Sequence, residues 1–323
     1  MPAAAPTPRA TSFAYVVLAH TDPRRVLAAV QRIQELSPGA RVLVRHTRGS
    51  GFLPARELAA AGAQELHSRL RVGWGTWSLT AAVLEALRTA EERWQPRATV
   101  VVSGQDHPVR DLRRWEEGIL ERGTDALLRP DPRDYVERYR DCWHEVPGGE
   151  LLPPRWVGSV ARLSERAGDL VGGPRLRLAG GRTLVLGHRR GPGCPAAPEG
   201  MVYRKGSLWM TLSARAVQHL LAAEQDRAVQ RYFASTLVPD ESFAHSVLGA
   251  LPGLLVEAGP TSWPFFPPGG GAHPRSVVLS DLEAVRDSGA AFTRKVVSPV
   301  SDAFVHAVDA LVDADRAAAG CPG

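Results

Sequence analysis

The chain has 323 residues, of which 44% are hydrophobic and 23% are charged, a composition that can bury the core of one large or two modest domains. No apolar run approaches the roughly 20 residues of a membrane helix, and Met1–Thr11 lacks the charged-then-apolar order of a signal peptide, so we expect a cytoplasmic protein without an integral membrane segment. The net charge of +5 is spread over interleaved acidic and basic residues, which argues against nucleic acid as a partner.

The first part of the chain alternates between short apolar runs rich in β-branched residues and stretches with apolar positions at helical spacing. Strands are predicted over residues 12–19, 41–44 and 98–102, and helices over 22–36 and over 78–94, the latter with Ser78 as its N-cap. Strands that alternate with helices favour an α/β fold with a mostly parallel, doubly wound sheet.

The second part is less regular. Residues 131–198 hold many Pro, Gly and Arg residues with little periodicity, so loop is expected there. Order returns with an apolar segment, three helices and an amphipathic tail, predicted over residues 203–212, 213–225, 227–233, from about 239, and 301–319. Ser213 is expected to cap the first of these helices. We expect a single domain over residues 12–300, followed by a C-terminal helix and tail over 301–323.

The usual phosphate-loop, dinucleotide, serine-hydrolase and zincin motifs are absent from the sequence. Asp313-Ala314-Asp315 fits the Asp-x-Asp pattern with which many sugar-nucleotide enzymes hold a divalent ion. It lies in the predicted C-terminal helix rather than after a strand, so a solvated helix face is expected.

The cysteines, Cys142, Cys194 and Cys321, are odd in number and far apart, with no CxxC pair and none of the familiar zinc-ligand spacings. A disulfide framework, a metal site or a cofactor is therefore not expected. Of 39 basic residues only Lys205 and Lys295 are lysine. A coding bias explains the arginines, and the two remaining lysines are candidates for positions that need a compact ammonium.

Five segments stand out in chain order. They are Val72-Gly73-Trp74-Gly75-Thr76-Trp77-Ser78, Val101-Val102-Ser103-Gly104-Gln105-Asp106-His107-Pro108, Lys205-Gly206-Ser207-Leu208-Trp209, Val238-Pro239-Asp240-Glu241-Ser242-Phe243, and Ala272-His273-Pro274-Arg275-Ser276 with Phe292-Thr293-Arg294-Lys295. Together, over about residues 13–297, they resemble the core-2/I-branching glycosyltransferase family, which includes β-1,6-N-acetylglucosaminyltransferases and peptide O-xylosyltransferases. Each segment alone is weak, whereas five in order are specific.

The resemblance implies a GT-A-type fold and an inverting, metal-independent transfer from a nucleotide sugar, with residues 12–130 as the nucleotide-binding half and 131–300 as the acceptor and catalytic half. Inversion requires a base for the acceptor hydroxyl on one side of the sugar and positive charge on the leaving phosphates on the other. Without a credible Asp-x-Asp pair, cationic side chains must supply that charge.

Glu241 matches the family's catalytic base, the glutamate of its Pro-Asp-Glu motif. The alternative is that Asp240 and Glu241 only cap a helix and match its dipole. Arg275 and Lys295 match the two cations that contact the diphosphate in metal-independent members, although an arginine after His-Pro also suits a simple pair with a carboxylate. Lys205 fits a functional or a structural role equally.

Asp106 ends a buried strand, where open α/β sheets present ligand-binding residues, and its segment matches the family's Ser-Gly-x-Asp-x-Pro stretch. It is therefore expected in the cleft between donor and acceptor, the alternative being a turn-capping aspartate before Pro108. Trp74, Trp77 and Trp209 are expected either in the sugar pocket or in the core.

His46 stands where many family members have an aspartate near the uracil base, so the carboxylate is missing here. A UDP-sugar of N-acetylglucosamine or xylose is the favoured donor, with a hydroxyl-bearing acceptor. The Golgi relatives' membrane anchor and disulfides are not found, which favours a soluble, bacterial-type member. The alternatives are a non-catalytic nucleotide-sugar-binding protein and a nucleotide-sugar hydrolase on the same fold.

Overall fold

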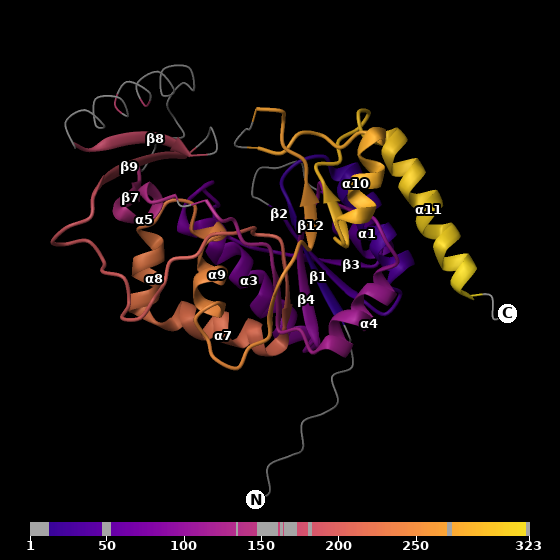
Figure 1. Ribbon diagram of the computed structural model, residues 1–323, viewed down its shortest axis with the longest axis horizontal. Helices are drawn as coiled ribbons and strands as arrows, with labels where there is room; N and C mark the ends of the chain where they lie inside the picture. The colour runs from indigo at the N-terminus through magenta and orange to yellow at the C-terminus, as the bar shows by residue number, and fades with distance from the viewer. Residues whose placement is uncertain are drawn as a thin grey trace, which may run out of the picture.

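Seven strands of the described chain form a central sheet between two groups of helices (Figure 1). The computed structural model describes residues 13–46, 53–133, 135–146, 161, 164, 173–179, 183–269 and 273–320. Of the positions discussed above, Met1–Thr11, Ala272 and Cys321 lie outside these residues, as does part of the irregular stretch 131–198.

The sheet has the strand order β11-β6-β10-β4-β1-β2-β3, and β10 alone among them runs against its neighbours. The strands are β1 (Phe13–Ala19), β2 (Arg41–His46), β3 (Ala63–Leu66), β4 (Ala98–Ser103), β6 (Ala126–Leu128), β10 (Met210–Ser213) and β11 (Val256–Ala258). The chain leaves β1 toward β2 and β3 and returns on the other side at β4. This reversal between β1 and β4 is a topological switch point, and the predicted α/β fold with a mostly parallel sheet is confirmed.

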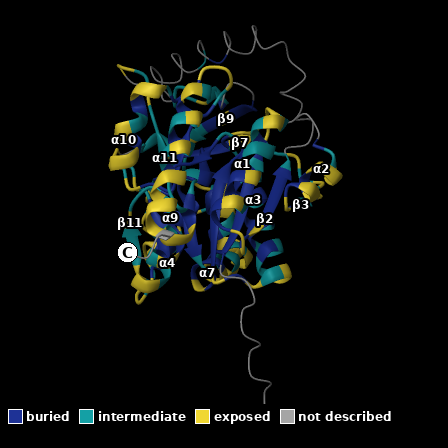
Figure 2. Cartoon of the chain, turned by 90° about the vertical axis from the view of Figure 1, so that its right-hand side faces the viewer, coloured by how far each residue is buried: buried dark blue, intermediate teal, exposed yellow. Residues whose placement is uncertain are grey.

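Helices cover both faces of the sheet (Figures 1 and 2). One face carries α1 (Pro23–Leu36), α4 (Leu112–Arg122), α10 (Leu282–Asp287) and α11 (Asp302–Gly320), and the other α3 (Trp77–Trp94), α7 (Ala214–Gln225), α8 (Arg227–Ala234) and α9 (Phe243–Leu248). Because side chains alternate along a strand, Tyr15 and Val17 of β1 join the first core and Ala14 and Val16 the second. Among the described helices, none is both long and apolar enough to cross a membrane.

The predicted C-terminal helix is α11, and it packs on the same core as α1. Phe304, Val308 and Val312 recur at helical spacing and are between 0% and 3% exposed. Full burial of a side chain of this kind contributes about 1.5–3 kcal/mol to folding. The helix is therefore a structural part of the sheet's first face.

Two smaller sheets flank the central one. The first consists of β12 (Ser262–Pro264), β13 (Phe292–Arg294) and β5 (His107–Pro108), and the second of β7 (Asp141–Glu145), β9 (Thr183–Arg189) and β8 (Arg175–Ala179). The second sheet lies in the stretch where loop was expected. Gly187 of this sheet pairs with Trp143, and a Cβ at Gly187 would lie 2.5 Å from the indole ring. A glycine, which is unfavourable in most strands, is therefore required here for packing.

The remaining described elements are short: α2 (Ala55–Ala60), α5 (Glu137–Arg140), η2 (Pro239–Glu241) and η3 (Leu279–Asp281). The predicted cap Ser213 is confirmed, since its Oγ accepts the N–H of Ala216 at 3.2 Å. The predicted cap Ser78 is wrong. The helix α3 starts at Trp77, and Ser78 Oγ instead accepts the N–H of Gly73 at 2.8 Å, which holds the preceding loop against the helix.

Candidate functional site

Polar residues of several sequence motifs meet at one edge of the central sheet. The strands β4 and β6 end at this edge, and Asp106 and Asp131 follow them. Because β10 runs in the opposite direction, it begins at the same edge, which places Lys205 and Trp209 there. This is the edge at which open α/β sheets bind ligands.

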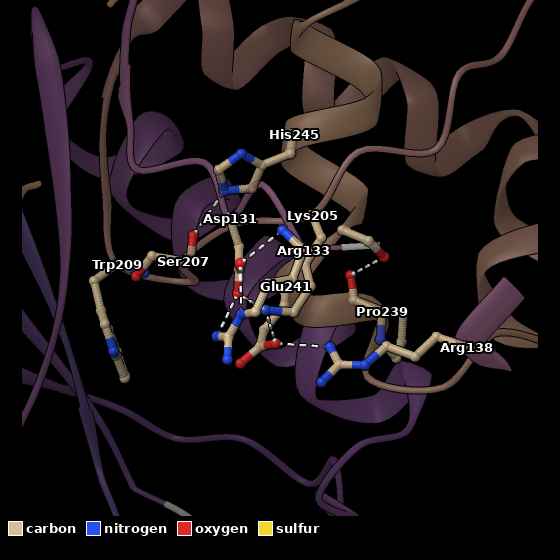
Figure 3. Close-up of polar contacts among 10 residues, drawn as sticks. Asp131, Arg133, Arg138, Lys205, Ser207, Trp209, Pro239, Glu241 and His245 are labelled. Atoms are coloured by element: carbon tan, nitrogen blue, oxygen red, sulfur yellow. Dashed lines mark hydrogen bonds and ion pairs between the residues drawn. The ribbon is translucent and has the colours of Figure 1, made fainter. Parts of the chain in front are cut away.

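Glu241 lies at the centre of the polar contacts (Figure 3). Its Oε2 accepts a hydrogen bond from Nη1 of Arg138 at 2.7 Å and lies 3.4 Å from Nζ of Lys205. The Glu241 side chain is 29% exposed, whereas that of Lys205 is 9% exposed. The carboxylate is thus held by cations from the protein side and is accessible from the solvent side.

The Lys205 ammonium is shared between two carboxylates. Its Nζ lies 2.6 Å from Oδ2 of Asp131, which also accepts hydrogen bonds from the Arg133 guanidinium. Burial alone would raise the pKa of Asp131, but the hydrogen bonds from Arg133 and Lys205 hold it well below its usual range. Asp131 therefore stays ionised and fixes the position of Lys205 beside Glu241.

Three cations surround the ring of Tyr135. The guanidinium carbon of Arg138 and Nζ of Lys205 each lie 4.3 Å from the ring centroid, and the Arg133 guanidinium lies 5.3 Å from it. The face of an aromatic ring attracts such cations. Sequence reasoning missed Tyr135, Arg138 and Asp131, because they lie in the stretch without periodicity; the alternation of Tyr and Arg over residues 133–140 was the available signal.

A strained backbone position presents Glu241. Val238, two residues before Asp240, has φ of 54°, a left-handed conformation that a β-branched residue rarely adopts and that costs about 1–3 kcal/mol. Its N–H donates to the carbonyl of Gly75 at 2.9 Å. The first and fourth sequence motifs are thus joined directly, and the contact with Gly75 supports the turn that carries Glu241.

Gly206 joins the third motif to the same turn. Its N–H donates to the carbonyl of Glu241 at 2.8 Å. A Cβ at Gly206 would lie 2.0 Å from Cε1 of His245 and 2.4 Å from the carbonyl oxygen of Arg129, so no larger residue fits. His245 Nε2 in turn lies 3.0 Å from the carbonyl oxygen of Ser207, and burial lowers the pKa of this imidazole. The Lys205 backbone is therefore held closely against Glu241.

Asp240 and Glu241 do not cap a helix. Val238 and Ser242, the residues before η2 and α9, hold the cap positions without a side-chain hydrogen bond, so the cap part of the alternative is wrong, whereas both acids do lie in the first turn of η2. Asp240 is 7% exposed, and burial together with the neighbouring Glu241 charge raises its pKa to about 7. Its Oδ1 has no hydrogen-bond partner among the residues that the structure describes.

Asp106 is buried beneath the same edge. It accepts hydrogen bonds from the N–H of Ser103 and, at 2.8 Å, from the hydroxyl of Ser262, and Arg294 Nε lies 3.6 Å from it. Burial raises the pKa of Asp106, against the effect of Arg294. Asp106 therefore caps the turn through its contact with Ser103, as the alternative expected. It also forms an ion pair with Arg294.

Arg294 is a further residue that sequence reasoning missed, although it stands in a motif beside Lys295. It is 9% exposed, and its guanidinium lies over the Trp209 ring at 4.3 Å. Burial lowers the pKa of Arg294, while the charges of Asp106 and Glu241 oppose this effect. Arg294 thus connects Asp106, Trp209 and Glu241 electrostatically.

Arg275 and Lys295 lie side by side, with the Lys295 N–H 3.4 Å from the carbonyl oxygen of Arg275. The Arg275 guanidinium binds both carboxylate oxygens of Asp281, at 2.6 and 2.7 Å. Within the described residues, by contrast, the Lys295 ammonium has no ion pair, and burial followed by the charge of Arg294 lowers its pKa. Contact of either residue with a diphosphate stays a prediction, and Lys295 is the one with an unengaged cation.

The three tryptophans differ in position. Trp77 packs edge-on against Phe243 at 5.3 Å and belongs to the second core. Trp74 is 40% exposed, with its ring edge-on to His273 at 5.6 Å, and Trp209 lies beneath Arg294. Trp77 and Trp209 are both half-buried against the second core, whereas Trp74 is exposed, and contact of Trp74 or Trp209 with a sugar stays a prediction.

His46 ends β2, at the same edge of the sheet as Asp106, and is half-buried. Burial lowers its pKa, and the charge of Glu65 opposes this. Its contact with a nucleotide base stays a prediction.

The Asp-x-Asp pair lies on α11, as expected from the sequence. Asp313 Oδ1 lies 2.8 Å from Nη2 of Arg32, and Asp315 lies 3.8 Å from Arg286. Both carboxylates thus lie near arginines of the neighbouring helices α1 and α10, on the face of the sheet that α11 covers.

No family model matches the sequence, and no curated protein matches it. Among solved structures, the chain is similar to the galactosyltransferase LgtC in complex with donor and acceptor sugar analogues, with a TM-score of 0.41 and 11% identity over 93% of this chain and 95% of that chain. It is also similar to a putative glucose-1-phosphate thymidylyltransferase from Bacillus anthracis, with a TM-score of 0.36 and 8% identity over 77% and 86% of the two chains. HddC from Yersinia pseudotuberculosis has a TM-score of 0.26 and 10% identity over 42% and 66%. Similarities at these values identify no family.

Proposed function

We propose that this protein is a GT-A-type glycosyltransferase that transfers a sugar from a nucleotide sugar to an acceptor hydroxyl, with inversion and without a metal ion. The observation that carries the proposal is the Glu241 carboxylate, accessible from solvent and surrounded by protein cations at the ligand-binding edge of the sheet. The order of the five motifs supports it further, and backbone contacts of Gly75 and Gly206 join the first and third motifs to the fourth, which contains Glu241.

In the proposed reaction, Glu241 accepts the proton of the acceptor hydroxyl. The acceptor oxygen forms a bond to the anomeric carbon, and the bond between that carbon and the phosphate oxygen breaks on the opposite face. The electron pair of the broken bond leaves with the nucleoside diphosphate. One carboxylate base and one cationic region on the other side of the sugar are sufficient for this sequence of bond changes.

The candidate cations for the diphosphate are Lys205, Arg294, Lys295 and Arg275. Of these, Lys205 lies beside the base Glu241, and Arg294 pairs with Asp106. Lys295 is the best suited of these because its ammonium has no ion pair among the described side chains. Arg275 is engaged by Asp281, so its first role in the proposal is to hold the segment that pairs with Lys295. A direct phosphate contact would require it to exchange that partner.

Arg138 has a different role in the proposal. It donates to Glu241 at 2.7 Å and so holds the carboxylate in position, on the side of the sugar where the acceptor is proposed to bind.

A uridine nucleotide carrying N-acetylglucosamine or xylose is the proposed donor, on the resemblance of the motifs. His46, rather than an aspartate, ends the second strand, and a half-buried imidazole suits stacking on or hydrogen bonding to a base.

The test is a product assay with UDP-, dTDP- and GDP-sugars, with and without a panel of hydroxyl acceptors, for the wild type and Glu241→Gln. We expect acceptor-dependent release of nucleoside diphosphate that the substitution abolishes. Release that does not depend on any acceptor would identify a hydrolase. Binding of nucleotides without any turnover would identify a binding protein, and no nucleotide binding at all would overturn the proposal.

A further inference from the structure

A second group of reactive side chains lies on one face of the small β7-β9-β8 sheet, outside the proposed active site. Cys142 of β7 pairs with His188 of β9, and His144 lies two residues along β7. Because side chains alternate along a strand, all three lie on the same face. Their ligand atoms lie within 4.8 Å of one another, and Cys142 Sγ is 3.5 Å from His144 Nε2.

A fourth candidate ligand comes from the turn that follows β9. Cys194 closes this turn, with its N–H donating to the carbonyl of Gly191 at 3.0 Å, and its thiol is close enough to that of Cys142 to interact with it electrostatically. Arg190 secures the turn, since its guanidinium donates to the backbone carbonyls of Tyr139 at 3.0 Å and Asp141 at 3.1 Å. The atoms within 4.8 Å of one another thus belong to one thiol and two imidazoles, and the neighbouring Cys194 thiol is the group that would complete a set of four.

We propose that Cys142, His144, His188 and Cys194 bind a zinc ion. Two thiolates and two neutral imidazoles form the ligand set of many structural zinc sites, and soft sulfur with imidazole favours zinc over the oxygen-binding metals. Zinc–sulfur and zinc–nitrogen bonds of the usual length separate tetrahedral ligand atoms by roughly 3.3–3.8 Å. The Cys142–His144 distance already falls in that range, whereas His188 and Cys194 would have to approach these two ligands.

The hydrogen bonding of His188 fits the role of a ligand. Its Nδ1 lies 3.1 Å from the carbonyl oxygen of Arg189, which can only accept, so Nδ1 carries the proton and Nε2 is left with its lone pair. Zinc-bound histidines usually donate their other ring nitrogen to such an acceptor. The rings of His144 and His188 are stacked at 5.5 Å, and a turn of the exposed His144 ring brings both lone pairs toward one point.

The role of the ion in this proposal is structural. On the other face of β7, Trp143 packs with Leu237 and Val238, the residues that lead to the strained turn before Glu241. Zinc would connect β7, β9 and the turn at Cys194, and so stabilise the layer that supports this turn. The proposal is independent of the glycosyltransferase proposal, because neither the ligands nor their tests involve a sugar.

The test uses the full chain, purified without a polyhistidine tag, and measures bound zinc by elemental analysis and thermal stability before and after chelation. We expect about one zinc per chain, a lower Tm after chelation, and its recovery with zinc but not magnesium. Cobalt added to the stripped protein should give the visible absorption of a tetrahedral site and a near-ultraviolet thiolate band. Cys194→Ser and His188→Ala should each weaken zinc binding about tenfold or more, and His219→Ala, at an exposed histidine of α7, should not.

Cys194 is only half-buried and His188 is partly exposed, so these variants are expected to fold even where a substitution of the buried Cys142 does not. Wild-type protein that neither contains zinc nor binds zinc or cobalt after reduction would overturn the proposal. So would thiol counting that finds Cys142 and Cys194 joined as a disulfide in the purified protein, with no zinc recovered. Cobalt spectra that are unchanged in both variants would remove these residues as ligands.

Discussion

Glu116 and Glu241 show how different surroundings suit the same side chain to different roles. Glu116 of α4 is 7% exposed and accepts hydrogen bonds from the hydroxyls of Tyr15 and Ser37. Glu241 is 29% exposed and is held by Arg138 and Lys205. The first carboxyl connects α4 to β1 and to the end of α1, whereas the second is offered to solvent at the sheet edge.

The difference lies in what compensates the charge. Burial raises the pKa of Glu116 to about 7, because its hydroxyl partners only partly offset the loss of water. Around Glu241 the compensating groups are full cations, which a negatively charged ligand can compete for. A carboxyl with hydroxyl partners is therefore suited to a structural role, and one with cationic partners to a site where charge is exchanged.

The largest effect is expected for Glu241→Gln. The amide keeps the size of the side chain but cannot accept the acceptor's proton, so turnover should fall on the order of 10²-fold or more with nucleotide binding little changed. Glu116→Gln is the matched control, because it makes the same chemical change in the core. Steady-state rates and nucleotide titrations of both variants measure this contrast, and a folded Glu241→Gln variant with most of its activity would remove Glu241 as the base.

A smaller effect is expected from substitution of Lys295, whose ammonium has no ion pair among the described side chains. Lys295→Ala should slow transfer and weaken nucleoside diphosphate binding by roughly ten- to a hundredfold, with Lys295→Arg intermediate, because a planar guanidinium does not replace a compact ammonium. Arg275→Ala should also lower thermal stability, since it leaves Asp281 without its bidentate partner.

The control for these cations must be an arginine whose contacts are solvated. Arg32 is unsuitable, because it is 8% exposed and pairs with Asp309 and Asp313 of α11. Arg113 is the suitable choice, because its side chain is 74% exposed and its ion pair with Glu117, at 3.2 Å, lies on the surface. Arg113→Ala should change neither rate nor binding, and identical kinetics for the Lys295 and Arg113 variants would leave Lys295 without a phosphate role.

Individual residues show which parts of the fold and of the site could be predicted from the sequence. The strand β1 and the helix α1 follow from apolar periodicity, because burial on one face imposes that periodicity. The cluster of Tyr135, Arg138 and Asp131 could not be predicted in this way, because polar contacts between distant segments produce no periodic pattern in the sequence. The same reason applies to Cys142 and His188, which only the antiparallel pairing of β7 and β9 brings together.

The pH dependence of stability tests the structural role of Glu116 in the comparison with Glu241. The pKa of Glu116 is raised from an ordinary 4.5 to about 7 in the folded protein, so its proton stabilises the fold below pH 4.5 and this contribution is lost as the pH rises through 7. The loss is on the order of 3 kcal/mol. Glu116→Gln should flatten the stability profile between pH 4.5 and 7, and denaturant unfolding at several pH values measures it.

The exposed Glu199 provides the control for that profile. Glu199→Gln should retain the wild-type dependence on pH, because this carboxyl remains in contact with water in the folded protein. A wild-type slope that persists in Glu116→Gln would show that other groups, among them Asp240, set the stability in this range.

The smallest effect is expected from chelation, and it separates the two proposals. Because Lys205, Arg294 and Lys295 belong to the chain, EDTA should leave turnover within about threefold, a change of about 0.7 kcal/mol in the barrier. Chelation should nevertheless lower the Tm if zinc leaves the Cys142 cluster, so the rates must be measured well below the unfolding temperature of the stripped protein. Zinc should then restore the Tm without raising the rate. Complete loss of activity in EDTA, restored by manganese, would instead require carboxylate ligands at the sheet edge, and the buried Asp106 and Asp240 would be the first residues to substitute.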